Sequence, residues 1–294
     1  MSAPATMPAA QDSRPVRFGL LTRALGRNRA IVAGLAIVLA LTLVALAASM
    51  ITPYSYHAMS YDAVLAGPSR AHVFGTDGLG RDLFTRVVYS FQVSLKVAFG
   101  SVVLALLVGI PLGLVAGYWG GLLDGLLMRL IDMLLAFPAI LLAIALITIL
   151  GQGLTVMVIA IAVVYVPILA RVLRGSVLDV RQATYVEGAR ARGAGHMRLM
   201  LRHVLPNSIG PTLVQATLLM AFAIQIEAGL SFLGLGVQPP TPSLGYMLQE
   251  NHGYISQSPW GSLFPCLAIA LAVLGFNLLG TGLRSSLDPR GRAR

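Results

Sequence analysis

The chain has 294 residues, of which 56% are hydrophobic and 11% are charged, and its formal net charge is +10. A soluble domain carries about 25% charged residues, so this composition excludes an ordinary globular core, and it is too apolar for a disordered or fibrous chain. The single cysteine, Cys266, excludes an internal disulfide framework and a cysteine-rich metal site. The composition predicts an integral membrane protein with several spans.

Six apolar stretches are long enough to cross a membrane, for which a helix needs about 20 residues. The first, 31–51, contains no charge and follows Arg27 and Arg29. Its triplet Ala45-Leu46-Ala47 resembles a signal-peptidase site, but the run is longer than the core of a signal peptide, which favours an uncleaved anchor over a cleaved leader. The remaining runs lie near 93–118, 126–150, 154–170, 211–236 and 263–283. The prediction is an all-α membrane protein with six transmembrane helices.

The distribution of positive charge predicts the orientation, because short arginine-rich segments stay on the cytoplasmic side. The N-terminal tail, the segment between the fourth and fifth spans, the C-terminal tail and Arg129 hold 17 of the 21 basic residues. Both termini are therefore predicted to be cytoplasmic. Positive residues along the inner face indicate contact with membrane lipid and argue against nucleic acid as a partner.

This orientation gives an expected domain organisation. The expected order is a cytoplasmic tail at 1–30, the first transmembrane helix at 31–51, a periplasmic segment with an interfacial helix at 52–90, a five-helix membrane core at 91–284 with a cytoplasmic loop at 171–210, and a cytoplasmic tail at 285–294.

The sequence contains no motif for catalysis. Lys96 is the only lysine and is not followed by Ser or Thr, which excludes a phosphate-binding loop of the Walker type. None of the five histidines forms an H-E-x-x-H pair, and no G-x-S-x-G sequence occurs. His57 and His72, near Asp62 and Asp77, are read as solvated loop residues in preference to a metal site. The chain is predicted to be non-catalytic and to hold no cofactor or metal, so another polypeptide must bind any ATP and Mg.

The polar segment between the fourth and fifth spans has clear helix signals. Thr184 followed by Glu187 fits a capping box, which predicts a short helix beginning near Tyr185. Gly193 and Gly195 can adopt left-handed conformations that would end this helix.

A second short helix is predicted from about His196 towards Pro206. Arg190 and Arg192 keep the first helix out of lipid, and a helix of this length is not stable without packing partners. The segment therefore indicates docking to a cytoplasmic protein.

The same residues resemble a known family. Glu187-Gly188-Ala189, Gly193 and the sequence 203–206 resemble the EAA loop of ABC importer permeases, although alanine is usual at position 188. In that family the loop forms a coupling helix held by the ATPase subunit. The resemblance implies an ATPase-coupling role for the following residues: Tyr185, Glu187, Gly188, Ala189, Arg190, Gly193, His203, Leu205 and Pro206.

Further motifs resemble the dipeptide, oligopeptide and nickel permease family from about residue 20 to 290. They include Phe74-Gly75-Thr76-Asp77, Gly80-Arg81-Asp82, Tyr118-Trp119-Gly120-Gly121, Phe137-Pro138, Arg202-His203-Val204-Leu205-Pro206-Asn207 and Glu227-Ala228-Gly229-Leu230-Ser231-Phe232. The long N-terminal helix is similar to that of the C-type subunit. The resemblance implies a type I ABC importer fold, a second, B-type permease subunit, two ABC ATPase subunits and an extracytoplasmic substrate-binding protein. It also implies dipeptides or oligopeptides as cargo, with nickel chelates or glutathione as alternatives.

Glu227 and Asn207 are the candidates for the translocation pathway or a gate. A charged group in a span costs about 2.5 to 3.5 kcal/mol, so Glu227 needs either a functional role or a structural partner on a neighbouring helix. Both interpretations stay open at this stage. A second hypothesis, an ion-driven secondary transporter with Glu227 as the ion site, would leave segment 171–206 without a purpose.

Other charged and proline residues give local expectations. Arg129 and Asp132 are three residues apart and are expected to pair on one helix face. Pro138 and Pro167 are expected to break or kink the third and fourth spans. Residues 80–91 are expected to form a separate interfacial helix before the second span.

Overall fold

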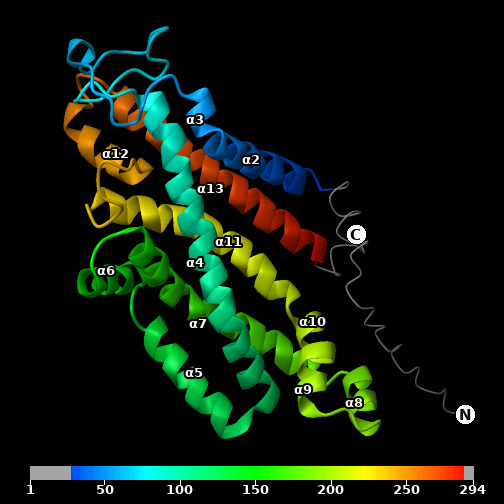
Figure 1. The fold of residues 1–294 in the computed structure, drawn as a ribbon. Coiled ribbons are helices and arrows are strands. Elements are labelled where there is room, and N and C mark those ends of the chain that lie inside the picture. Colours follow the sequence, from blue (N-terminus) through cyan, green and yellow to red (C-terminus); the bar gives the residue numbers. More distant parts are fainter. Residues whose placement is uncertain (1–27, 288–294) are drawn as a thin grey trace, which may run out of the picture.

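The computed structural model describes residues 28–287, and its regular elements there are helices. Within this range five helices are long and apolar enough to cross a membrane. They are α2 (Arg29–Leu46), α4 (Leu83–Trp119), α7 (Leu154–Val180), α11 (Gly210–Phe232) and α13 (Trp260–Leu287). Figure 1 shows them as one elongated bundle, in which α2 lies alongside α13.

The third predicted span, near 126–150, is a pair of helices bent sharply against each other. α5 (Gly121–Leu135) and α6 (Ala139–Leu150) meet at an angle of 87°. The break falls at Pro138, as predicted, because a proline disfavours helical backbone in the residue before it and donates no backbone hydrogen bond. Counting the pair as one broken span gives the predicted six.

Two helix boundaries differ from the predictions. The first apolar run divides at Ala47 into α2 and the single turn α3 (Ala48–Ile51). The separate interfacial helix expected at 80–91 is wrong, because α4 begins at Leu83 and continues into the second span. Pro167 was also expected to break or kink its span, and α7 continues as one helix through this proline.

Small residues bring α4 and α7 into close contact at the centre of the bundle. Gly109, Gly113 and Gly117 lie four residues apart on one face of α4, against α7. A Cβ atom added at Gly113 would lie 2.4 Å from the carbonyl oxygen of Ala170. This spacing lets two helix backbones approach in the way that small-xxx-small sequences do in membranes.

Ion pairs connect α5 to α7. Arg174 donates to Asp124 over 2.6 Å, and Arg171 pairs with Asp132. The expected pairing of Asp132 with Arg129 is therefore wrong, because the arginine on the neighbouring helix reaches the carboxylate. Ile131 is the only buried residue of α5 within the described chain, so most of α5 is open to solvent, lipid or a partner.

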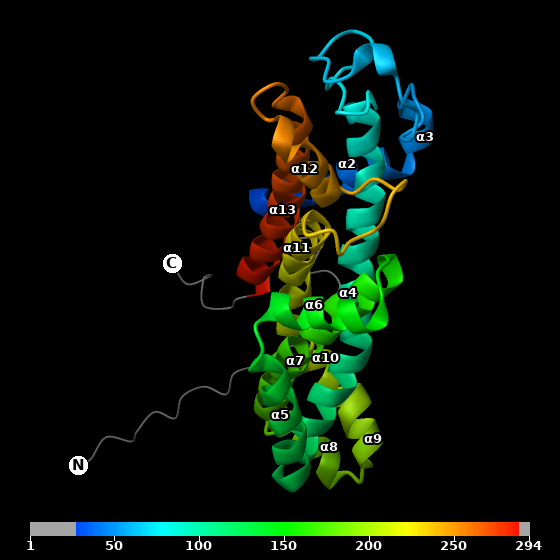
Figure 2. The ribbon, with the colours of Figure 1, turned by 90° about the vertical axis from the view of Figure 1, so that its left-hand side faces the viewer.

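The short elements gather at the two ends of the bundle, as Figures 1 and 2 show. One end carries α8 (Thr184–Ala191), α9 (His196–Arg198), a π-helical segment η2 (Leu199–Val204) and α10 (Leu205–Ser208). The other end carries η1 (Tyr61–Ala63), α12 (Leu244–Asn251) and η3 (His252–Tyr254). Each end presents one candidate site.

Candidate coupling site and outer charge cluster

The helix α8 has one buried face and one exposed face. Val186 and Ala189 are buried in an apolar cluster with the ends of α4 and α7. Glu187 and Arg190 are exposed, and within residues 28–287 neither of them has an ion-pair partner. Tyr185 lies at the edge of the cluster, where burial raises the pKa of its hydroxyl. The inner face fixes the helix to the bundle and leaves the other face for a partner.

The start of α8 differs from the predicted capping box. Thr184 is the first residue of the helix, the cap is Ala183, and no side chain bonds to the first turn. Val186 and Glu187 instead donate their backbone N–H groups to the carbonyl of Ala183, over 2.8 and 3.2 Å. The predicted capping box is therefore wrong, although a helix does begin within one residue of the predicted start.

The end of α8 depends on Gly193. Its φ angle is +83°, a left-handed conformation that favours glycine, and its N–H donates to the carbonyl of Arg190 over 2.9 Å. Gly195 has a φ angle of −66°, so the left-handed conformation predicted for it is wrong. A substitution at Gly188 would meet only the Arg192 guanidinium, 3.8 Å away.

The part of this segment that follows α8 contains a π-helical stretch, η2. Leu205 donates its backbone N–H to the carbonyl of Met200, five residues earlier. Pro206 follows immediately and has no N–H to donate, which favours a local change in hydrogen-bond register. Leu205 packs against the apolar cluster, Pro206 is exposed and His203 is partly buried. The predicted second helix thus begins at His196 but is not a regular α-helix.

Two contacts fasten this segment to the end of α4. The hydroxyl of Tyr118 and Nδ1 of His196 lie 3.0 Å apart. The guanidinium of Arg181 donates to the carbonyls of Gly117 and Tyr118 over 2.9 and 3.1 Å. The segment follows α7 directly in the chain, and these hydrogen bonds attach it to α4 as well.

The exposed face of the segment is strongly cationic. It presents four arginines around Glu187, together with two exposed apolar side chains. The arginines are Arg190, Arg192, Arg198 and Arg202, and the apolar residues are Met197 and Leu201. A partner complementary to this face would offer carboxylates around an apolar patch.

The two pathway candidates are both tied to their own surroundings. Glu227 is fully buried, and its carboxylate accepts hydrogen bonds from the hydroxyls of Ser94 and Ser231, each over 3.0 Å. Ser94 belongs to α4, so the glutamate joins α4 to α11. Asn207 donates to the carbonyl of His203 over 2.7 Å. These contacts favour the structural interpretation of Glu227, and a role of either residue in the pathway stays a prediction.

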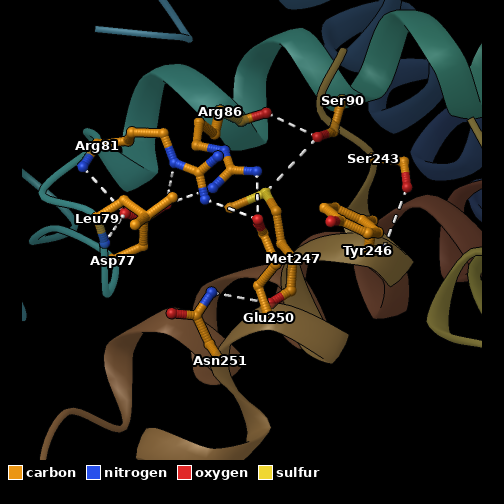
Figure 3. A network of polar contacts seen from close by, with 10 residues as sticks. All are labelled: Asp77, Leu79, Arg81, Arg86, Ser90, Ser243, Tyr246, Met247, Glu250 and Asn251. Carbon is orange, nitrogen blue, oxygen red and sulfur yellow. Dashed lines mark hydrogen bonds and ion pairs between the residues drawn. The ribbon is translucent and has the colours of Figure 1, made fainter. Parts of the chain in front are cut away.

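The opposite end contains a cluster of four charged side chains, shown in Figure 3. Arg81 donates to Asp77 over 2.7 Å and to Glu250 over 2.8 Å. Arg86 pairs with the same Asp77 and reaches Glu250 over 2.7 Å. Burial alone would lower the pKa of Arg81, but the carboxylates of Glu250 and Asp77 outweigh it and raise the pKa above its ordinary value. We call these four residues the outer charge cluster.

The outer charge cluster joins α12 to a part of the chain that lies more than 160 residues earlier in the sequence. Asp77 and Arg81 belong to the loop before α4, Arg86 lies in the first turn of α4 and Glu250 lies in α12. The sequence motifs around residues 74–82 marked this loop, but nothing in the sequence identified Glu250 as the partner.

The loop motif also has a local role. Asp82 caps α4 by accepting the N–H of Thr85 over 2.8 Å, and its other oxygen lies 3.0 Å from Nδ1 of His72. Gly80 has a φ angle of +72°, and an added Cβ would lie 1.9 Å from the carbonyl oxygen of Ser60. In the part of the chain that the structure describes, no group of three or more His, Cys, Asp or Glu residues is arranged to hold a metal ion.

Comparison with known proteins identifies the family of the chain. Residues 109–293 match the family model described as the inner membrane component of binding-protein-dependent transport systems, and residues 18–68 match that of the N-terminal transmembrane domain of oligopeptide transport permease C. The chain therefore belongs to the family of ABC importer permeases, and it is a non-catalytic, multi-pass inner membrane component.

Individual relatives agree along most of the chain. It is 46% identical over 266 residues to the dipeptide transport system permease protein DppC of Alkalihalophilus pseudofirmus, covering 90% of this chain and 88% of that protein. It is 42% identical over 289 residues to the glutathione transport system permease protein GsiD of Pectobacterium atrosepticum, covering 97% and 96%.

Solved structures confirm the fold. An inward-facing structure of the MetNI methionine ABC transporter matches with a TM-score of 0.58 at 19% identity, covering 69% of this chain and 97% of the matched chain. The predicted all-α permease fold is thus confirmed.

Proposed function

We propose that the chain is the C-type transmembrane subunit of an ATP-driven importer of dipeptides or oligopeptides. Support comes from its identity to a permease named for dipeptide transport. Glutathione is the second candidate cargo, because a permease named for its transport is 42% identical to this chain. Glutathione is itself a small peptide, so one pathway chemistry serves both, while nickel chelates are a more distant alternative.

The observation that carries this proposal is the two-faced helix α8. Val186 and Ala189 fix it to the bundle, while Glu187 and Arg190 point outwards without a partner in residues 28–287. This exposed face binds an ABC ATPase subunit, which holds ATP and Mg. A second ATPase subunit binds the B-type permease chain in the same way. The residues predicted from the resemblance, 185–193 and 203–206, form this coupling site.

The proposal includes an orientation and a division of the chain. The cytoplasmic loop at 171–210, which contains the coupling site, and the termini, 1–30 and 285–294, lie in the cytoplasm. The outer charge cluster belongs to the periplasmic side, where a substrate-binding protein would deliver the cargo. The span at 31–51 and the core at 91–284 cross the membrane, and the core forms the pathway with the B-type subunit.

A double substitution tests the coupling role. Glu187→Ala with Gly193→Ala changes one exposed side chain and the left-handed turn, and should abolish co-purification of the ATPase while the chain still inserts. The matched control is Gln182→Ala, an exposed residue outside α8. Undiminished ATP-dependent peptide uptake by the double variant would refute the assignment.

The orientation has its own test. A cysteine placed at Arg192 should react with a membrane-impermeant maleimide only after the cells are permeabilised, and one at Arg70 should react in intact cells. The reverse pattern would overturn the proposed sidedness.

A further inference from the structure

A groove of about 440 Å³ lies between α2 and α4, away from the coupling site and the outer charge cluster. Its walls are mainly apolar, with one positive charge. From α2 they include Thr42, Ala45 and Leu46, and from α4 they include Gln92, Lys96 and Phe99.

The groove lies beside the last turn of α2. Gln92 donates to the carbonyl of Ala45 over 2.8 Å, which fixes the level of α4 against α2. The 18 residues of α2 are about 27 Å long, close to the thickness of the hydrocarbon layer, so its last turn lies at the membrane boundary. The same end of the bundle carries the first turn of α4 (Figure 1).

Lys96 is unusual among the charged residues of the membrane helices. It is exposed, whereas its neighbours Val97 and Ala98 are fully buried. None of the ion pairs within residues 28–287 includes Lys96, while the arginines Arg171 and Arg174 are both paired with carboxylates. An ammonium group without a counter-charge in a membrane span is costly, so an anion from outside the described chain would stabilise Lys96.

The direction of the side chain places this anion at the membrane boundary. In an α-helix the Cα–Cβ bond tilts towards the N-terminus, and the N-terminus of α4 is the end that carries the outer charge cluster. A lysine stem can lie along an apolar surface while its ammonium group reaches the level of the lipid headgroups. The ammonium of Lys96 can therefore reach the depth at which phosphates lie.

We propose that this groove binds an anionic phospholipid, with its phosphate on the Lys96 ammonium and an acyl chain along Leu46 and Phe99. Leu46 is 77% exposed and Phe99 is 41% exposed, so the groove offers bare apolar surface next to the charge. A phospholipid supplies an apolar chain and a negative phosphate in one molecule. A protein partner would instead have to supply a carboxylate and an apolar side chain at the same place.

Native mass spectrometry of the purified transporter complex can count the bound lipid. The complex is stripped of lipid in detergent and titrated with phosphatidylglycerol or, separately, with phosphatidylcholine. Lys96→Gln removes the charge from an exposed position, Lys96→Arg keeps it, and Arg284→Gln removes an equal charge from an exposed position at the other end of the bundle. Thr42→Phe fills the groove and leaves the charge in place.

The tightest phosphatidylglycerol should bind about fivefold more weakly to the Lys96→Gln complex, because one basic residue near the membrane surface contributes about 1 kcal/mol. Thr42→Phe should also lose this lipid. Lys96→Arg and Arg284→Gln should retain it, and Lys96→Gln should leave the binding of phosphatidylcholine unchanged.

Three results would overturn the proposal. The first is wild-type binding of phosphatidylglycerol by Lys96→Gln in an intact complex. The second is equal weakening of both lipids by Lys96→Gln, which would show that the groove does not select an anionic phospholipid. The third is quantitative cross-linking of a cysteine at position 96 to another subunit, which would show that protein fills the groove.

Discussion

Replacing Arg86 by methionine tests how much the outer charge cluster stabilises the chain. The Arg86 side chain is 2% exposed and that of its partner Asp77 is 1% exposed, so the charge pair is almost completely removed from solvent. The substitution keeps most of the side-chain volume and removes the charge. It leaves two carboxylates, Asp77 and Glu250, with the single guanidinium of Arg81.

The expected cost follows from this change in charge balance. Removing one partner of a buried ion pair costs about 3 to 5 kcal/mol, mainly because the other charge stays buried without compensation. Arg81 still contacts both carboxylates, over 2.7 and 2.8 Å, so we expect the lower end, about 3 kcal/mol. For a chain of this size that corresponds to a decrease of about 6 °C in the transition temperature.

The assay is thermal unfolding of the purified complex in detergent, measured by tryptophan fluorescence. Arg70→Met, which removes an exposed arginine from the same loop region, should leave the transition temperature unchanged. Adding Glu250→Gln to Arg86→Met restores the charge balance, so the double variant should lose less stability than the two single variants together. An Arg86→Met transition within 1 °C of the wild type would refute the reasoning.

Three further predictions concern the bundle and the coupling site. Gly113→Ala should lower the transition temperature by several degrees, because its Cβ would meet a backbone carbonyl at 2.4 Å, whereas Gly125→Ala, with nothing within 4 Å, should not lower it. Gly193→Ala should weaken ATPase binding severalfold because a φ angle of +83° costs alanine about 1 kcal/mol, and Gly195→Ala should not. Tyr118→Phe removes a bond of 3.0 Å to the coupling segment and should lower ATP-dependent uptake without changing membrane insertion.

The two pairs of glycine substitutions each contain their own control. Equal effects of the two substitutions at positions 113 and 125 would contradict the close contact between α4 and α7. Equal ATPase binding by the variants at 193 and 195 would contradict the role of the left-handed turn. Unchanged uptake by Tyr118→Phe would show that the segment is held without this bond.

The apolar runs predicted the spans because membrane insertion depends on local composition. Pro138 predicted the break between α5 and α6 for the same reason, since a proline acts on its own helix. The extent of α4 was missed because Asp82, a cap residue, starts the helix at Leu83, ten residues before the apolar run. Local sequence patterns thus predict that a helix exists more reliably than they predict the residue at which it begins.

Contacts between distant segments could not be predicted in this way. Glu250 lies 164 residues after Arg86, and nothing in its neighbourhood indicates an arginine partner. Asp132 has Arg129 within reach on its own helix, yet it pairs with Arg171 on α7. The coupling segment was predicted from its glycines and from a family resemblance, whereas its attachment through Tyr118 and His196 needed the fold.

The two hydrogen bonds from Arg181 to carbonyl groups near the end of α4 have a mechanical consequence. Only residues 181–183 separate α7 from α8, and Arg181 fixes this short joint to Gly117 and Tyr118. A displacement of α8 would therefore be transmitted to α4 as well as to α7. The sharp bend of 87° at Pro138 lies between α5 and α6, outside this linked pair of helices.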